Sequence, residues 1–347
     1  MSGLTDFLGN KVLTARLARD IASGRFAHAY IIEGKEGCGK RTLAKLICSA
    51  ISCTGDDIPC MKCIRCDKIA RGQSPDVIEI EADKDRVQIG VDVIRRLRED
   101  AVYAPNDLPR KFYIIKKADT MNPQAQNALL KILEEPPDHV MFLLLCENAD
   151  DLLATIRSRA PVLRIEGLPD DTICNYLREN SADAKALAEK SPDAFLAAVK
   201  LARGSLGMAM SLTDEKKAEE CLEYYRKAEK YMELLADRRN AANELAFYEY
   251  ASKLTSGKQR DELSKIYLLL ADAARDLINV KLTREPAPIF YATPEKARSA
   301  ADKFALGVLI RLTEIFTEAA NSIDRNVNVS LSMIHTASAA AGAGKTK

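Results

Sequence analysis

Short apolar runs alternate with amphipathic stretches along the first half of the chain. The apolar runs have the length and the nearly continuous character of strands buried on both faces. Each is followed by a stretch with helical spacing, and Pro123 stands where the first turn of one such helix begins. The predicted strands lie within HAYIIEG (28–34), DVIEIEA (76–82), KFYIIKKAD (111–119), HVMFLLLCEN (139–148) and PVLRIEG (161–167). This alternation predicts a parallel sheet covered by helices on both faces.

The strand pattern stops near the end of the last of these runs, and helical patterns follow. We expect an α/β domain over residues 1–166 and a small helical domain over 167–211. Residues 212–340 are helical almost throughout and should form an all-α C-terminal domain, with a frayed tail at 341–347.

Composition and charge limit the kinds of function that this chain can have. The chain has 347 residues, of which 47% are hydrophobic and 29% charged, so it can bury a core. No apolar stretch approaches the roughly 20 residues of a membrane span, and the N-terminus lacks the features of a signal peptide, so we expect a cytoplasmic protein. The net charge of +1 and the absence of Trp argue against tight DNA binding by charge or base stacking alone.

A G-x-x-x-x-G-K pattern follows the first predicted strand and precedes a helix. The backbone N–H groups of such a loop surround phosphate oxygens, and its Lys reaches the terminal phosphates. The residue after the Lys normally holds Mg²⁺ through a hydroxyl, but here it is Arg41, and the hydroxyl of Thr42 is rotated by about 100° around the helix. The candidate nucleotide-binding residues are Gly34, Gly37, Gly39, Lys40 and Thr42. The loop predicts a degenerate nucleotide site that leaves binding of ATP or ADP open.

Hydrolysis of ATP needs a second element, a carboxylate at the end of a neighbouring strand. The third predicted strand ends instead in Lys116 and Lys117, and Asp119 lies beyond the strand end. Because this loss agrees with the one at Arg41, we expect ATP or ADP, if bound, not to be hydrolysed by this chain.

Four of the nine Cys residues form a cluster with the spacing C-x6-C-x2-C-x2-C. They are Cys53, Cys60, Cys63 and Cys66. Four thiolates complete a tetrahedral Zn²⁺ site with no open position, which predicts a structural zinc. An iron–sulfur cluster and a redox C-x-x-C pair are the alternatives. The other five Cys lie among apolar residues and should be buried.

Several motifs in this order resemble the clamp-loader subunits of bacterial DNA polymerase III. They are HAYIIEGKEGCGKRTLA (28–44), the four clustered Cys, KFYIIKKADTMNPQAQNALLKILEEPP (111–137) and IRSRA (156–160). The resemblance covers residues 1–210, and residues 212–340 fit the family's C-terminal collar in length and class only. It implies an AAA+-type P-loop domain with a zinc insertion at 53–66, a helical lid and an oligomerising collar.

The resemblance also separates two kinds of subunit. The motor subunits, gamma and tau, look like ATPases, whereas the delta-prime subunit usually has an eroded ATP site. Relative to the motor pattern this chain departs at Arg41, at Lys116-Lys117, at Cys146-Glu147, and at Gly207, where an Arg is expected. It keeps Ser158 and Arg159 of the family's Ser-Arg-Cys motif, with Ala160 in place of the Cys. The resemblance implies that Arg159 acts in trans as an arginine finger on a neighbouring ATP site.

The interpretation is a non-hydrolysing delta-prime subunit that helps load the sliding clamp onto primed DNA. Its expected partners are the gamma/tau and delta subunits and, within the complex, the sliding clamp and primer–template DNA, with no membrane. The alternatives are an active gamma/tau-like clamp-loader ATPase and a stand-alone zinc-bearing nucleic-acid binder.

Overall fold

The computed structural model describes residues 3–4, 7–83, 88–238, 240–254, 260–283, 288–291, 293–323 and 329–343. The chain divides into two compact units. The first holds Met1–Ile173 and Arg203–Met208, and the second holds Cys174–Ala202 and Ala209–Lys347.

The first unit is built on a five-stranded sheet. Its strands are β1 (Ala29–Glu33), β2 (Val77–Ile80), β3 (Lys111–Ile115), β4 (Val140–Cys146) and β5 (Val162–Arg164). The order is β2-β3-β4-β1-β5, and every neighbouring pair is parallel. Ile31 in β1 lies opposite Leu144 of β4 and Val162 of β5. All five predicted strands are confirmed, and with them the α/β P-loop fold class.

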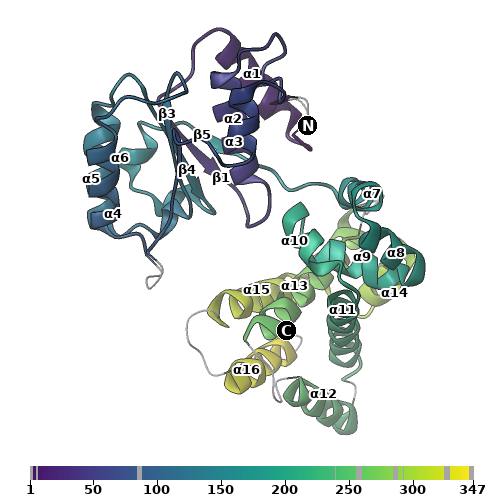
Figure 1. Cartoon of the computed structure of the whole chain (residues 1–347). Coiled ribbons are helices and arrows are strands. Elements are labelled where there is room, and N and C mark those ends of the chain that lie inside the picture. Colours follow the sequence, from purple (N-terminus) through teal and green to yellow (C-terminus); the bar gives the residue numbers. More distant parts are fainter. Residues whose placement is uncertain are drawn as a thin grey trace. The chain divides into compact units, whose positions relative to one another are not determined.

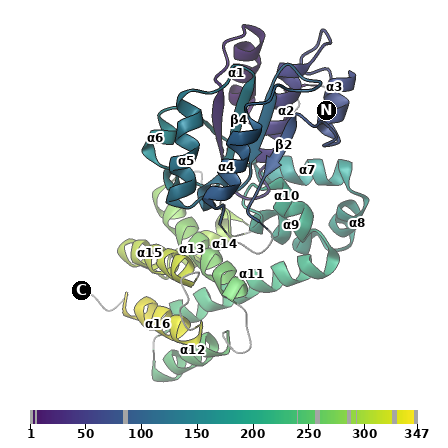
Figure 2. The same ribbon diagram turned by 60° about the vertical axis from the view of Figure 1, so that its left-hand side comes forward.

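Helices cover both faces of this sheet (Figure 1). One face carries α1 (Lys11–Ala22), α2 (Lys40–Ser52) and α3 (Ile64–Ala70), and the other carries α4 (Val91–Asp100), α5 (Pro123–Glu134) and α6 (Ala154–Arg157). Figure 2 shows α4 and α5 side by side on their face. Two short 3₁₀ turns, η2 (Ala118–Thr120) and η3 (Ala149–Asp151), follow β3 and β4.

The strands supply two separate cores because successive side chains point to opposite faces. Ile31 and Leu144 belong to the core under α4, α5 and α6, whereas Ile32 and Leu143 belong to the core under α1 and α2. Burial on both faces explains why these strands are apolar without interruption. Among the Cys outside the cluster, four are buried as predicted, and only Cys38 is half-buried.

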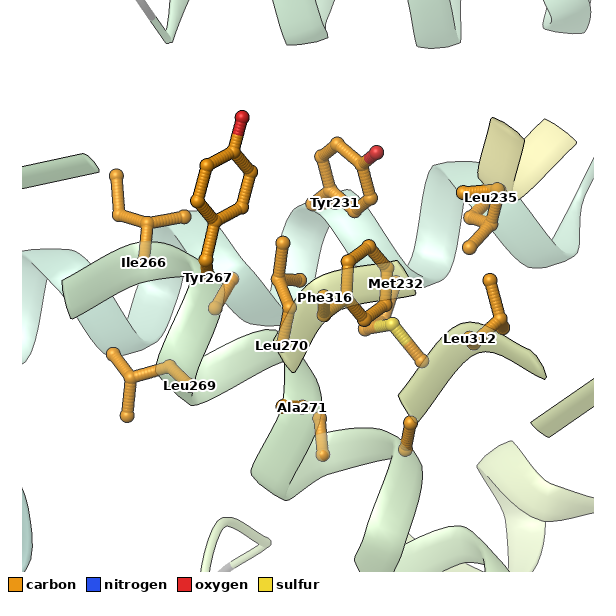
Figure 3. Close-up of a cluster of buried hydrophobic side chains, with 14 of the residues drawn as sticks. Tyr231, Met232, Leu235, Ile266, Tyr267, Leu269, Leu270, Ala271, Leu312 and Phe316 are labelled. Carbon is orange, nitrogen blue, oxygen red and sulfur yellow. The ribbon is translucent and has the colours of Figure 1, made fainter. Parts of the chain in front are cut away.

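The second unit is helical throughout its described residues. Its helices, some of which begin in the first unit, are α7 (Asp170–Asn180), α8 (Ala182–Lys190), α9 (Pro192–Leu201), α10 (Leu206–Leu212), α11 (Glu215–Ala236), α12 (Ala241–Lys253), α13 (Arg260–Leu282), α14 (Pro294–Ala301), α15 (Leu306–Ile323) and α16 (Val329–Gly342). Its core joins Tyr231 and Met232 of α11, Tyr267 and Leu270 of α13, and Phe316 of α15 (Figure 3). The predicted all-α character after the sheet is confirmed for these residues. No described helix combines the length and the apolar character needed to cross a bilayer.

A buried carboxylate fixes the loop that leads into β3. Asp76, fully buried just before β2, accepts hydrogen bonds from the backbone N–H groups of Asn106 (2.7 Å), Asp107 (2.7 Å) and Leu108 (2.9 Å). The Asn106 side chain donates a further one at 3.0 Å. Burial by itself raises the pKa of Asp76, but the four donors outweigh it, and the pKa lies below its usual value.

Replacing Asp76 by Asn should destabilise the first unit, because two backbone donors would then face an amide NH₂ group. We expect Asp76→Asn to lower the free energy of unfolding by about 2–4 kcal/mol at pH 7, measured by urea denaturation. Asp107→Asn is the matched control, since the Asp107 side chain is exposed, pairs only with Lys68, and should cost at most about 1 kcal/mol.

The pH dependence of this effect has a fixed sign. A carboxyl whose pKa is lower in the folded than in the unfolded chain stabilises the fold above its unfolded pKa of about 3.9, and that stabilisation is lost as the pH falls through the folded pKa. The difference between the native chain and Asp76→Asn should therefore shrink below about pH 4. A difference that stays constant or grows in acid would contradict this account.

Candidate functional site

The P-loop pattern lies where it was predicted, between β1 and α2. Gly37 and Gly39 have φ values of 72° and 96°, a left-handed conformation that glycine adopts without strain. Lys40 is the first residue of α2, and its ammonium group donates hydrogen bonds to the carbonyl oxygens of Gly34 and, at 2.9 Å, Lys35. The loop thus has the local geometry of a phosphate-binding turn, and Lys40 is held at it by two carbonyl groups. Thr42 is exposed on the first turn of α2.

The segment 203–208 packs against this loop. The N–H group of Gly207 donates to Gly37 O at 2.9 Å, and the Ser205 hydroxyl donates to Glu36 O at 2.7 Å. A Cβ atom on Gly207 would lie only 2.9 Å from Gly37 Cα, so there is no room for a side chain. The absence of the expected Arg at this position therefore has a steric reason. Beside the contact lies a cavity of about 300 Å³, lined among others by Gly34, Lys35 and Arg203, a volume at the lower end for small-molecule sites.

The two unexpected cations of the site converge on one carboxylate. Arg41 donates to Glu79 Oε1 from Nε at 2.8 Å and lies 2.7 Å from it through Nη2. Lys116, which follows β3, lies 3.3 Å from Glu79 Oε2 and 2.8 Å from Glu81 Oε2. Lys45 of α2 adds a longer contact of 3.9 Å to Glu79. Arg41 and Lys116 are therefore linked through β2 into one charge network.

The network stabilises the charged forms of its members. Partial burial alone raises the pKa of Glu79, but hydrogen bonds and charge from Arg41 and then Lys116 bring it below its usual value. Burial likewise lowers the pKa of Lys116, and the contacts with Glu81 and Glu79 reverse this and raise it. Both shifts favour the charged forms of Glu79 and Lys116 at neutral pH.

Sequence reasoning missed Glu79 and Glu81 as members of the site. Their signal was present in the sequence, since Glu79 and Glu81 alternate with Ile78 and Ile80 and would share one face of an extended segment, although β2 itself ends at Ile80. The sequence alone, however, does not show that β2 is the edge strand next to β3, and that position brings both carboxylates to Lys116.

The end of β4 completes the neighbourhood of the P-loop. Cys146 is its last residue, is buried, and pairs in register with Glu33 of β1; burial raises the pKa of the Cys146 thiol to about 12. The next residue, Glu147, donates its backbone N–H to Asp119 Oδ2 at 2.8 Å. Asp119 therefore joins η2 to the end of β4, as expected of a capping residue beyond the strand end.

Ser158 and Arg159 lie just beyond α6, on the opposite face of the sheet from α2. Arg159 Nη2 donates to Glu134 Oε1 at 2.7 Å, and Nη1 donates to Thr155 O at 2.9 Å and to Ser158 Oγ at 3.2 Å. The Arg159 side chain is 34% exposed. The following Ala160 is fully buried in the core under α6.

The four clustered Cys come together as predicted, in the stretch that runs from Cys53, just after α2, to Cys66 inside α3. Their sulfur atoms all lie within 4.8 Å of one another. Thiolates around Zn²⁺ stand about 3.8 Å apart at a Zn–S length of about 2.3 Å, so this donor set fits a tetrahedral zinc ion. The segment also contacts α2 directly, because Cys66 Sγ lies 3.8 Å from Ser49 O.

Backbone N–H groups point at the sulfur atoms, as thiolate ligands require. The N–H of Cys60 donates to Cys53 Sγ at 3.3 Å, that of Cys63 to Cys60 Sγ at 3.3 Å, and that of Cys66 to Cys63 Sγ at 3.5 Å. Partial burial raises the pKa of Cys63, but hydrogen bonds from the backbone of Thr54 and Cys66 lower it to about 6. This arrangement can hold a metal ion and offers no position for substrate.

Metal content tests this site directly. We expect about one zinc per purified chain, and loss of that zinc together with increased protease cleavage within residues 53–66 in the variant Cys60→Ser/Cys63→Ser. Cys38→Ser, outside the cluster, is the control and should keep its zinc. Zinc content that survives the double substitution, or iron with the visible absorbance of an iron–sulfur cluster, would refute the zinc assignment.

Comparisons with known proteins agree with the predicted resemblance. Residues 9–169 match the family described as DNA polymerase III, delta subunit. The chain is 32% identical over 188 residues to DNA polymerase III subunit gamma of Buchnera aphidicola subsp. Schizaphis graminum, a match covering 52% of this chain and 51% of that protein. It is 35% identical over 212 residues to subunit tau of Escherichia coli K12, covering 60% of this chain and 32% of that protein.

A third relative, subunit tau of Bacillus subtilis, is 33% identical over 212 residues, which cover 60% of this chain and 37% of that protein. The chain thus spans between about a third and a half of the length of these relatives. Among solved structures, a gamma subunit-related protein from Thermotoga maritima aligns with a TM-score of 0.42 and 18% identity over 93% of this chain and 97% of that one, a likeness too weak to add to the argument. The resemblance to bacterial DNA polymerase III clamp-loader subunits is confirmed.

The same comparisons correct one expectation. We expected this chain to have no ATPase activity of its own, because of Arg41 and Lys116-Lys117. That expectation is wrong, since the relatives that match the P-loop region are gamma and tau subunits, the kind of clamp-loader subunit that hydrolyses ATP. The loop itself keeps the local geometry of a phosphate-binding turn, with Gly39 in a left-handed conformation and Lys40 at the start of α2.

Proposed function

We propose that this chain, which resembles the gamma/tau family of bacterial DNA polymerase III clamp-loader subunits, works as a subunit of such a complex in a delta-prime-type position. In that position it assists loading of the sliding clamp onto primed DNA during replication in the cytoplasm. Its partners are the gamma/tau and delta subunits and, within the complex, the clamp and primer–template DNA.

The observation that carries this proposal is the setting of Arg159. The residue follows a short helix, is partly exposed, and has its guanidinium oriented by Thr155, Ser158 and Glu134. An Arg acting in trans needs this combination of exposure and fixed orientation, because it must meet the developing charge on a phosphate held by another subunit. Ser158 contributes by accepting a hydrogen bond from the guanidinium.

The P-loop serves nucleotide binding in this proposal. Gly34, Gly37 and Gly39 supply the turn, and Lys40 supplies the cation for ATP or ADP phosphates. The zinc ion, held by the four Cys, has a structural role in ordering the segment between α2 and α3. Residues 212–340 act as the collar through which subunits assemble, with residues 167–211 as the lid.

Arg159→Ala tests the in-trans role. In a reconstituted complex with gamma/tau and delta subunits, we expect hydrolysis at the ATP site served by Arg159 to fall by roughly 10³-fold or more, because the charge on the transferring phosphoryl group loses its partner. Single-turnover hydrolysis and clamp loading on primed DNA are the measurements.

Arg157→Ala is the matched control for this substitution. Arg157 lies two residues earlier and pairs with Asp150 on the same exposed surface, so its loss should leave hydrolysis near the native rate. Equal activity of the native complex and the Arg159→Ala complex, with assembly intact, would remove the finger role.

An active gamma/tau-like ATPase is the second candidate, and the names of the relatives favour it.

For both candidate functions, Lys40→Ala should weaken binding of a fluorescent ATP analogue by tenfold or more, because the Lys reaches the β- and γ-phosphates. Mg²⁺-dependent turnover by the isolated chain that is lost with Lys40 would favour the active ATPase. Lys131→Ala, at an exposed residue of α5 on the opposite face of the sheet, is the control. Unchanged nucleotide affinity in Lys40→Ala would show that the loop is not a nucleotide site.

A further inference from the structure

In the part of the chain that the structure describes, Glu134 is the one carboxylate that contacts Arg159. It is the last residue of α5, and its Oε1 lies 2.7 Å from Arg159 Nη2. The two residues are 25 positions apart in sequence and come together because α5 and α6 pack on the same face of the sheet. No motif and no spacing along the sequence predicts this pair.

The position of Glu134 on its helix makes an Arg partner favourable. A helix carries partial negative charge at its C-terminus, so a carboxylate in the last turn is disfavoured unless a cation lies beside it. Arg159 supplies that cation. Its Nη1 meanwhile bonds Thr155 O, one of the carbonyl groups near the end of α6.

Counting the hydrogen-bond donors of Arg159 shows how many N–H groups of its guanidinium are available to a ligand. Arginine has five N–H donors in one plane. Three contacts, to Glu134 Oε1, Thr155 O and Ser158 Oγ, account for three of them. Two N–H groups therefore have no acceptor among the residues the structure describes. Because the other three fix the plane, the direction of these two is fixed as well.

We propose that Glu134 is a positioning residue for Arg159, holding its guanidinium so that two N–H groups face the phosphoryl oxygens of a neighbouring subunit's nucleotide. This inference rests on the proposed in-trans role of Arg159. Glu134 touches neither nucleotide nor reacting atoms and acts only through the Arg159 side chain.

The solvent exposure of the Glu134–Arg159 pair shows whether Glu134 orients the Arg159 side chain or blocks it from a neighbouring nucleotide. The two side chains are 34% and 50% exposed, and ion pairs this open to water are weak. Such a pair cannot withhold Arg159 from a polyphosphate, so it does not act as an inhibitory lock. It can bias the rotamer of a long side chain, and the expected effect on rate is therefore small, about two- to fivefold.

The experiment uses the reconstituted complex and single-turnover ATP hydrolysis. Glu134→Gln should lower the rate constant by about two- to fivefold without changing the nucleotide concentration for half-maximal rate, because only the orientation of Arg159 is altered. Glu135→Gln is the matched control, since Glu135 is the adjacent exposed carboxylate and should leave the rate unchanged. Raising the salt concentration should reduce the difference in rate constant between the native and Glu134→Gln complexes, because salt screens the exposed Glu134–Arg159 ion pair.

A double substitution separates this inference from the role of Arg159 itself. In an Arg159→Ala background, Glu134→Gln should have no further effect, since its only route of action is gone. If Arg159→Ala slows hydrolysis but Glu134→Gln behaves like Glu135→Gln, or if the two effects are additive, the positioning role of Glu134 is wrong and the finger stands. If Arg159→Ala has no effect, both fail.

Discussion

Parallel strands all end at one edge of a sheet, and the whole candidate nucleotide site depends on this constraint. β1 ends in the glycine loop, β3 in Lys116, and β4 in Cys146 and Glu147, so residues more than 100 positions apart meet at one edge. The strands can run side by side in this way only because helices bury both faces, which in turn requires continuous apolar sequence such as Val140–Cys146. The same apolar runs that stabilise the fold therefore also place the polar groups of the site.

The chemistry at that edge differs from a simple loss of metal ligands. Arg41 and Lys116 do not stand unpaired where a hydroxyl and a carboxylate are expected; both bond Glu79, and Lys116 also bonds Glu81. Each of the two cations is thus paired with a carboxylate of β2 or of the residue that follows it. Comparing the site residue by residue along the sequence misses this pairing.

Much of the fold was predictable because its signals are local. The five strands, Pro123 at the first turn of α5 and the end of that helix before Pro136 follow from short patterns. The four Cys ligands are local too, since all lie within 14 residues. What escaped prediction depends on contacts between distant segments: Gly207 against Gly37, Glu79 against Lys116, and Glu134 against Arg159. Helices α1 and α3 also went unassigned, and α3 is held in place by its first residues, which contain a cluster ligand.

The nucleotide loop and Arg159 are independent parts of this molecule. Lys40 and Arg41 begin α2 on one face of the sheet, whereas Arg159 follows α6, which packs on the other face. Among the described residues, no hydrogen bond or ion pair joins Arg159 to the loop, and its three contacts are to α5, α6 and Ser158. An altered ATP site therefore says nothing about whether Arg159 can serve a neighbour, and activity at the chain's own site does not argue against it. Under the proposed function the chain can both bind a nucleotide itself and serve the nucleotide of a neighbouring subunit, so the two roles have to be measured separately.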